Sequence, residues 1–231
     1  TKTGSAKLTL SGNNTFAGPV NLSGGTLSVG SNSALGLGAL NASGNAILQA
    51  ATAASLNNLI NLNGGLVLGG SADLSLNGLV TGAGGLTKQG TSTVTLNSAN
   101  TYTGGTTLAG GTLVLGNSLA LGSGVVTVTG PGTLDSNTTI NLGNNITLNG
   151  ALSTGGTADQ TLSGVISGAG SLTSNGLGNL TLSGVNTYTG GTTLSAGTLT
   201  LGNAGAISSG RLTVTGASNL NTNSPFALVN A

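Results

Sequence analysis

Leu, Val and Ile occur at every second position in short runs along nearly the whole chain, and Thr, Ser and Asn occupy the positions between them. Clear examples are Leu8-Thr9-Leu10, Thr26-Leu27-Ser28-Val29, Val94-Thr95-Leu96 and Ile146-Thr147-Leu148. An alternation with a period of two places the apolar side chains on one face of a strand. The pattern therefore predicts many short strands, each with one buried face.

The same sequence disfavours helices. It contains 44 Gly residues, and a Gly in a helix interior costs about 1 kcal/mol relative to Ala. No apolar stripe with a period of 3.6 residues extends far enough to cover a helix face. Only the Ala-rich segment 50–56 leaves a single helical turn as an alternative to a strand. We therefore predict an all-β protein.

The chain is an array of internal repeats. The stretch Asn100-Thr101-Tyr102-Thr103-Gly104-Gly105-Thr106-Thr107-Leu108 recurs 86 residues later, at 186–194, and a weaker copy with Phe16 begins at Asn14. Aligning residues 85–145 with 171–231 without a gap leaves 31 of 61 positions identical. A repeat at a fixed period indicates that each unit mainly contacts its neighbours.

The spacing of the runs predicts a parallel β-helix, also called a β-solenoid. The runs follow one another too closely for helical crossovers, whereas a coil of strands stacks parallel neighbours with only tight corners between them. At about 20 to 24 residues per turn, an 86-residue period would be about four turns and the chain about ten to eleven turns, on the order of 50 Å long. Gly and Asn would form the corners, and Thr, Ser and Asn would form hydrogen-bonded ladders outside an apolar core.

We expect one continuous β-solenoid over residues 1–231, with periods at 1–84, 85–170 and a partial one at 171–231. The third period stops partway through a unit, and neither end shows the polar cap that repeat arrays carry. We therefore expect the chain to be a piece of a longer polypeptide or to have its ends covered by a partner.

Charge is almost absent from the sequence. The chain has four Lys or Arg and three Asp residues, no Cys, no His, and a net charge of +1. Nucleic-acid binding needs clustered Lys and Arg to neutralise phosphates, so we expect no nucleic-acid partner. Segments rich in Leu, Val and Ile also argue against disorder.

Several motifs, read in order, resemble the autotransporter-associated β-strand repeat, also called the passenger-associated transport repeat. They are Gly85-Leu86-Thr87-Lys88, Val94-Thr95-Leu96, the stretch 100–108, and Gly111-Thr112-Leu113-Val114-Leu115-Gly116. The resemblance covers one block per period. It implies a bacterial passenger region that is carried out by a C-terminal outer-membrane β-barrel of the same polypeptide and displayed at the cell surface, where the repeats build a stalk and assist export.

The resemblance and the period together mark a set of residues that we expect to define the repeat structurally rather than chemically. They are Tyr102, Gly104, Gly105, Gly111, Leu113 and Gly116 in the second period, and Tyr188, Gly190, Gly191, Gly197, Leu199 and Gly202 in the third.

The candidate chemical residues do not assemble into a site. Asp73 and Asp159 lie one period apart, too far to act as paired carboxylates, and Asp135 stands at another phase. We expect all three to be solvated or to cap corners. The Gly-Gly-x-Gly-x-Asp loops that bind calcium in β-rolls are missing, so we expect no metal and no cofactor.

The aromatic residues at a fixed phase, Phe16, Tyr102 and Tyr188, suggest either platforms for sugars or packing over a corner of the coil. About four turns would separate them, which prevents a continuous aromatic strip, so we favour packing. Lys88 recurs as Lys2 and becomes Ser174. We interpret it as an outward position whose charge discourages lateral sheet pairing. We also expect Asn100→Ser to cost far less stability than Leu115→Asn.

These observations favour a structural role over an enzymatic one. The first hypothesis is a rigid, non-enzymatic spacer of a bacterial surface protein, located outside the cell, with no small-molecule substrate. The second is an adhesion or self-association module, in which the neutral Thr and Asn faces or the uncapped ends pair with other copies of the chain into filaments or cell-cell contacts. A polysaccharide-cleaving enzyme is the third, and it lacks a cluster of acidic residues.

Overall fold

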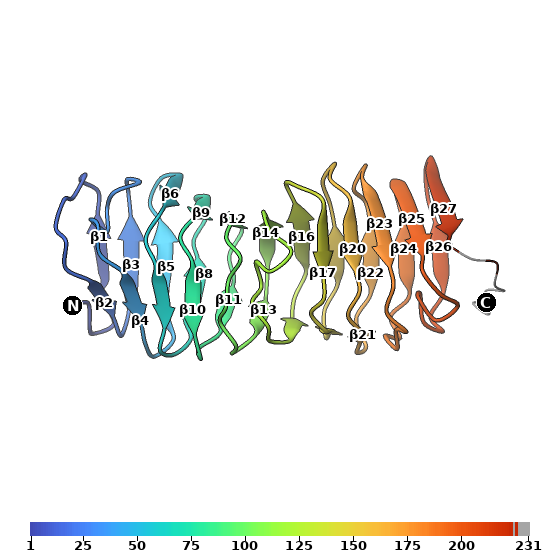
Figure 1. Ribbon diagram of the computed structural model, residues 1–231, viewed down its shortest axis with the longest axis horizontal. Helices are drawn as coiled ribbons and strands as arrows, with labels where there is room; N and C mark the ends of the chain where they lie inside the picture. The colour runs from blue at the N-terminus through green and yellow to red at the C-terminus, as the bar shows by residue number, and fades with distance from the viewer. Residues whose placement is uncertain (224, 226–231) are drawn as a thin grey trace.

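The computed structural model describes residues 1–223 and 225. Within them the chain forms an elongated coil of about 11 turns in which all sheets are parallel, and strands stack along the long axis from β1 at one end to β27 at the other (Figure 1). No helix is present in this part of the chain, so none there could cross a membrane. The predicted all-β parallel solenoid is confirmed.

Three faces make up each turn. Face 1 is a nine-stranded sheet. Its strands in stacking order are β1 (Lys7–Leu10), β3 (Thr26–Val29), β5 (Ala46–Ala50), β8 (Leu66–Gly69), β11 (Leu86–Lys88), β13 (Thr106–Leu108), β15 (Val126–Val128), β18 (Ile146–Leu148) and β21 (Ile166–Ser167).

Face 2 is a second nine-stranded sheet. Its strands are β6 (Ala54–Leu56), β9 (Leu74–Leu76), β12 (Thr93–Leu96), β14 (Gly111–Leu115), β16 (Gly132–Ser136), β19 (Leu152–Thr154), β22 (Leu172–Ser174), β24 (Thr192–Leu194) and β26 (Leu212–Val214). The segment 50–56, for which a helical turn was the alternative, is the end of β5 and β6.

Face 3 consists of two sheets separated by an irregular stretch. The first holds β2 (Val20–Leu22), β4 (Leu40–Ala42), β7 (Ile60–Leu62) and β10 (Val80–Gly82). The second holds β17 (Ile140–Leu142), β20 (Gln160–Leu162), β23 (Asn179–Leu182), β25 (Gly197–Leu201) and β27 (Ser218–Thr222).

Successive turns pair with a nearly constant offset in the sequence. Leu66 pairs with Leu86, Leu86 with Thr106, and Thr106 with Val126. Since side chains of paired residues lie on the same side of a sheet, every inward position continues as a column along the coil. The columns are filled mostly by buried Leu, Val and Ile, which form one apolar core.

The repeat does not contain a whole number of turns. Four turns beyond Leu86, the register of face 1 reaches Ile166. The residue equivalent to Leu86 in the third period is Leu172, which lies further along the chain and belongs to β22 on face 2. In the same way, β12 lies on face 2 and its equivalent β23 on face 3. Each period therefore advances by one face of the coil. The prediction of about four turns per period did not include this rotation, because the sequence limits the length of a turn only to about 20 to 24 residues.

Polar ladders follow the outside of the coil, as the sequence predicted. Asn41 Nδ2 donates to Asn21 Oδ1 at 2.8 Å, and Asn61 Nδ2 donates to Asn41 Oδ1 at 2.7 Å. Thr81 Oγ1 extends this ladder by donating to Asn61 Oδ1 at 3.1 Å. In these ladders the side-chain amides hydrogen-bond to one another across turns. They hold the turns in register on faces that have very few ionised residues.

The core columns predict a stability difference between neighbouring residues of β14. Leu115 is fully buried, whereas Val114 points outward and is partly exposed. We expect Leu115→Asn to lower the free energy of unfolding by about 3 to 5 kcal/mol, because it removes apolar contacts and buries an amide without partners. Val114→Asn, the matched control, is expected to cost less than about 1 kcal/mol. Urea unfolding of both variants measures the difference, and equal small losses would contradict the assignment of the core.

Candidate functional site

The first part of the repeated motif, residues 100–103, lies where face 3 has no strand, and its last part is β13 of face 1. The Asn100 side chain adds to the backbone hydrogen bonds between turns there, which include Thr101 N to Val80 O at 2.9 Å. Asn100 Oδ1 accepts from Val80 N at 2.8 Å, and Nδ2 donates to Ala120 O at 2.7 Å. One side-chain amide thus links three successive turns.

The third period repeats this arrangement on face 1. Asn186 Oδ1 accepts from Ile166 N at 2.7 Å, and its Nδ2 donates to Ala206 O at 2.5 Å. In the first period, on face 2, Asn14 Nδ2 donates to Ala34 O at 2.7 Å. The Asn residue of the motif therefore joins neighbouring turns in a segment without a strand in every period, and it bridges three turns in the second and third periods.

Asn100 and Asn186 are each only 4% exposed. These contacts argue against the expectation that Asn100→Ser would cost far less stability than Leu115→Asn, because a shorter side chain cannot reach both neighbouring turns. A signal for this role was present in the sequence, since Asn precedes the aromatic residue by two positions in all three copies.

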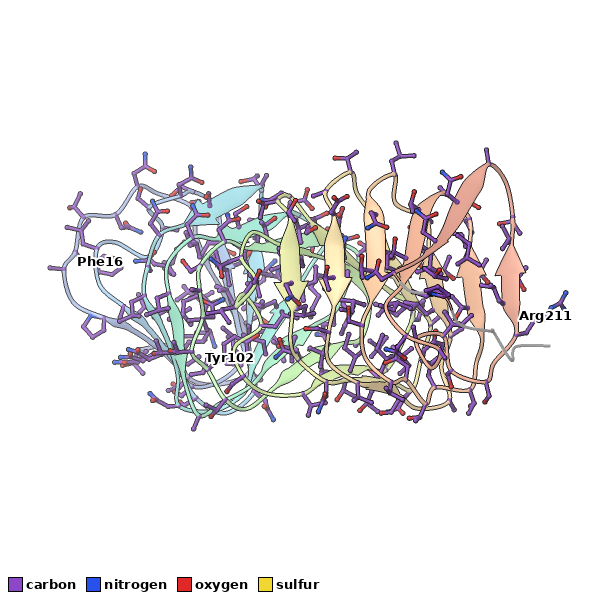
Figure 2. All side chains as sticks on the ribbon, turned by 45° about the vertical axis from the view of Figure 1, so that its right-hand side comes forward. Phe16, Tyr102 and Arg211 are labelled. Carbon is purple, nitrogen blue, oxygen red and sulfur yellow. The ribbon has the colours of Figure 1, made fainter. Side chains whose placement is uncertain are left out.

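Tyr102 and Tyr188 fill the core in the same segments, and both are completely buried. Tyr102 lies within the coil in Figure 2. Its hydroxyl hydrogen-bonds with Thr106 Oγ1 at 2.6 Å, and Tyr188 does so with Thr192 Oγ1 at 2.5 Å. The structure therefore places both rings inside, where they cannot serve as a platform for sugars.

Phe16 departs from this arrangement. It is 43% exposed and lies in a loop near the N-terminal end of the coil (Figure 2). The fixed phase of the three aromatic residues thus predicted core packing for two of them only.

The glycines of the motif allow a close approach of neighbouring turns. A Cβ on Gly104 would lie 2.5 Å from Gly84 C, and one on Gly190 would lie 2.5 Å from Gly170 C. The next residues, Gly105 and Gly191, have φ angles of 79° and 81°, which residues with a Cβ rarely adopt. These contacts support the structural role expected for the Gly-Gly pairs.

The remaining residues of the expected set also have packing positions. Leu113 and Leu199 are buried core residues, Gly111 and Gly197 have φ angles of 70° and 65°, and Gly116 and Gly202 lie against the backbone of Asn97 and Ser183.

The structure places Lys88 on the opposite side of its strand from the one predicted from the sequence. It is 1% exposed and lies in a column of apolar residues, between Leu68 and Leu108. Burial lowers the pKa of Lys88, and the carboxylate of Asp73 partly offsets that effect. The outward, gatekeeping role proposed for Lys88 is wrong. The alternation itself carried the signal, because Lys88 shares its side of the strand with Leu86.

The acidic residues act on the backbone of the corners. Asp73 Oδ1 accepts from Thr93 N, and Asp159 Oδ1 accepts from Asn179 N, each at 2.8 Å. Asp135 Oδ1 accepts from Ser136 N at 2.6 Å. The contacts of Asp73 and Asp159 agree with the interpretation as corner caps, whereas Asp135 lies within β16. Within residues 1–223, no three His, Cys, Asp or Glu side chains lie close enough to hold a metal ion.

Shallow hollows lie beside the loops that interrupt the faces. One of about 470 Å³ is lined by residues that include Asn32, Ser33 and Asn58, and one of about 340 Å³ is lined by Ser118, Leu119 and Asn144 among others. They are equivalent positions one period apart. Their linings offer amides and hydroxyls but no ionisable group, so neither hollow provides a general acid, a general base or an activated nucleophile.

Fold and motif together define a β-solenoid repeat protein. Residues 1–29, 86–115 and 172–201 match the family model described as Passenger-associated-transport-repeat. The three matched stretches include nearly all of the motifs quoted from the sequence, and the resemblance to this repeat is confirmed. No curated protein and no solved structure matches the chain.

The bridging role of Asn100 predicts a loss of folding stability when its side chain is shortened. We expect Asn100→Ser to lower the free energy of unfolding by about 2 to 4 kcal/mol, because Val80 N and Ala120 O are left buried without partners. Asn97→Ser, which shortens a residue of an exposed ladder, is the matched control and is expected to cost under about 1 kcal/mol. Chemical denaturation measures both, and a similar small loss for the two variants would refute the bridge.

The buried tyrosines predict a loss of stability at alkaline pH. Burial raises the pKa of Tyr188 to about 12 despite its hydrogen bond to Thr192, and burial also raises the pKa of Tyr102. The unfolded chain ionises its tyrosines near pH 10. The stability is therefore fully present below pH 10 and falls above it, by about 1.4 kcal/mol per pH unit at Tyr188 up to its folded pKa.

Because the chain has two Tyr and no Trp, tyrosinate absorbance reports on these residues directly. The folded protein is expected to show little tyrosinate at pH 11 and to gain it on addition of urea. Tyr188→Phe should make the decline of stability above pH 10 shallower. Normal ionisation of both tyrosines near pH 10 in the folded protein would show that they are not buried.

Proposed function

We propose that this chain is a rigid, non-enzymatic spacer in the surface-displayed passenger of a bacterial autotransporter. The observation that carries the proposal is that three passenger-associated transport repeats form one uninterrupted stack of turns. Backbone hydrogen bonds join every turn to the next, so the coil resists bending and extends by about 4.8 Å per turn.

Export can be assisted by the same geometry. Each turn of a solenoid gains most of its stability from the turn before it, so turns that emerge from the cell fold onto those already outside. Folding outside would then oppose return of the chain. In this proposal the partner is the C-terminal translocation domain of the same polypeptide, and the location is the bacterial surface.

The experiment uses the natural polypeptide in its own host and compares Leu115→Asn with Val114→Asn. Surface display is measured as the fraction of the repeat region that protease removes from intact cells. We expect Leu115→Asn to lower that fraction at unchanged synthesis, and Val114→Asn to leave it unaltered. Equal display of the two variants would refute assistance of export by folding, and a repeat region that protease never reaches would refute the surface location.

Self-association is the second candidate, and one observation favours it. Leu59, Leu79 and Leu119 are exposed at the corner that precedes face 3 and form an apolar ridge, with exposed fractions between 39% and 59%. Exposed apolar side chains on a nearly uncharged surface can pair with a second copy of the chain.

Sedimentation of the purified chain over a range of concentrations separates the two candidates. A plain spacer stays monomeric at every concentration. A self-associating module sediments faster as concentration rises, and replacing Leu79 and Leu119 by Ser would then restore the monomer. Association that persists in this double variant would rule out the apolar ridge as the contact.

A further inference from the structure

Three equivalent inward positions, one per period, carry Lys2, Lys88 and Ser174. All three side chains are buried, with exposed fractions of 8%, 1% and 1%. Because each period advances by one face, they lie on faces 3, 1 and 2 of the coil. The same structural position is therefore filled by Lys in two periods and by Ser in the third.

Both lysines place their ammonium groups against three backbone carbonyl oxygens. Lys2 Nζ donates to Thr3 O and Gly4 O at 2.8 Å and to Gly24 O at 3.0 Å. Lys88 Nζ donates to Gln89 O, Gly90 O and Gly110 O at 3.0, 3.1 and 3.2 Å. We call this set of three oxygens, from two successive corners, the carbonyl cradle.

The third period retains the backbone that builds the cradle. The equivalent carbonyls belong to Asn175, Gly176 and Ala196. The glycine that follows the last carbonyl has a φ of 66° at Gly25, 70° at Gly111 and 65° at Gly197. In each case the oxygen of the earlier corner glycine, Gly4, Gly90 or Gly176, is the atom nearest to where a Cβ on that residue would lie.

Neighbouring core positions change together with the lysine. Thr154 and Gln160 stand where the second period has Leu68 and Leu74, so three short polar side chains replace one Lys and two Leu. Together with Gly176, these side chains line a cavity of about 10 Å³, roughly the space of one water-sized particle.

An oxygen in this lining has no partner of its own. Gln160 is 3% exposed, and its Nε2 donates to Gly155 O at 2.8 Å. Its Oε1 has no hydrogen-bond partner among the described residues. A buried acceptor without a partner costs about 1 to 3 kcal/mol, which a bound donor or cation would offset.

We propose that the third carbonyl cradle, together with Ser174 and Gln160, binds a monovalent cation of ammonium or potassium size. The cation replaces the ammonium group that Lys2 and Lys88 supply in the other periods. All the oxygens offered are neutral, as in potassium sites built from carbonyl groups. Divalent ions hold their water more tightly and are usually bound with the help of carboxylates, so they fit this lining poorly.

The test is hydrogen exchange of the whole chain in ammonium chloride or potassium chloride against tetramethylammonium chloride at equal ionic strength. Tetramethylammonium is too large for the cavity and donates no hydrogen bond. We expect the amides of β22 and β24 to become more protected in ammonium, with a dependence on concentration that saturates as for a single site. If the amides of β22 and β24 are equally protected in ammonium, potassium and tetramethylammonium chloride, the proposal is overturned and the cavity holds water instead of a cation.

Two reciprocal variants make the test specific. Ser174→Lys brings its own ammonium group, so its β22 and β24 amides are expected to be well protected in either salt. Lys88→Ser removes that group from the second cradle, so β11 and β13 are expected to lose protection in tetramethylammonium and regain part of it in ammonium.

Lys7→Ser is the matched control, because Lys7 is an exposed lysine of β1, and it should leave the response at β22 unaltered. An ammonium response that persists in Ser174→Lys would show a general salt effect and overturn the proposal. The test does not depend on the role as a spacer, since it is made on the isolated chain.

Discussion

The register between successive turns is the constraint on which the rest of the structure depends. A nearly constant offset between paired residues keeps inward positions in columns and outward positions in ladders. Columns of Leu, Val and Ile then exclude water, while amide ladders outside hold neighbouring turns in register. A slip of one residue would turn every side chain to the wrong side.

The 86-residue repeat is not a whole number of turns, so successive repeats are placed on different faces of the coil. Each period moves its motif to the next face. The irregular segments with Asn14, Asn100 and Asn186 lie before the first strand of face 2, between the two sheets of face 3, and beyond the last strand of face 1. In two of these irregular segments Tyr102 and Tyr188 fill the core. The 86-residue repeat of this chain is therefore a unit of sequence that fits any of the three faces.

Alternation and spacing were sufficient to predict the strands, the parallel solenoid and the polar ladders from the sequence. They were not sufficient for Lys88 and Asn100, whose residue types usually lie at the surface. Both bond to backbone groups of a neighbouring turn, 20 or more residues away along the chain: Asn100 to Ala120 O, and Lys88 to Gly110 O in addition to two carbonyls of its own corner. Prediction of the rotation of the repeats also required the exact number of residues per turn, and the sequence limits this number only to a range of several residues.

A distance between two spin labels tests the central claim most directly. Val67 and Ser167 are partly exposed and lie in one column of face 1, five turns apart, and the chain has no cysteine to interfere with labelling. With Val67→Cys and Ser167→Cys, we expect a single narrow distribution centred at about 24 Å. A broad distribution, or one centred far from that value, would contradict a rigid coil with this register.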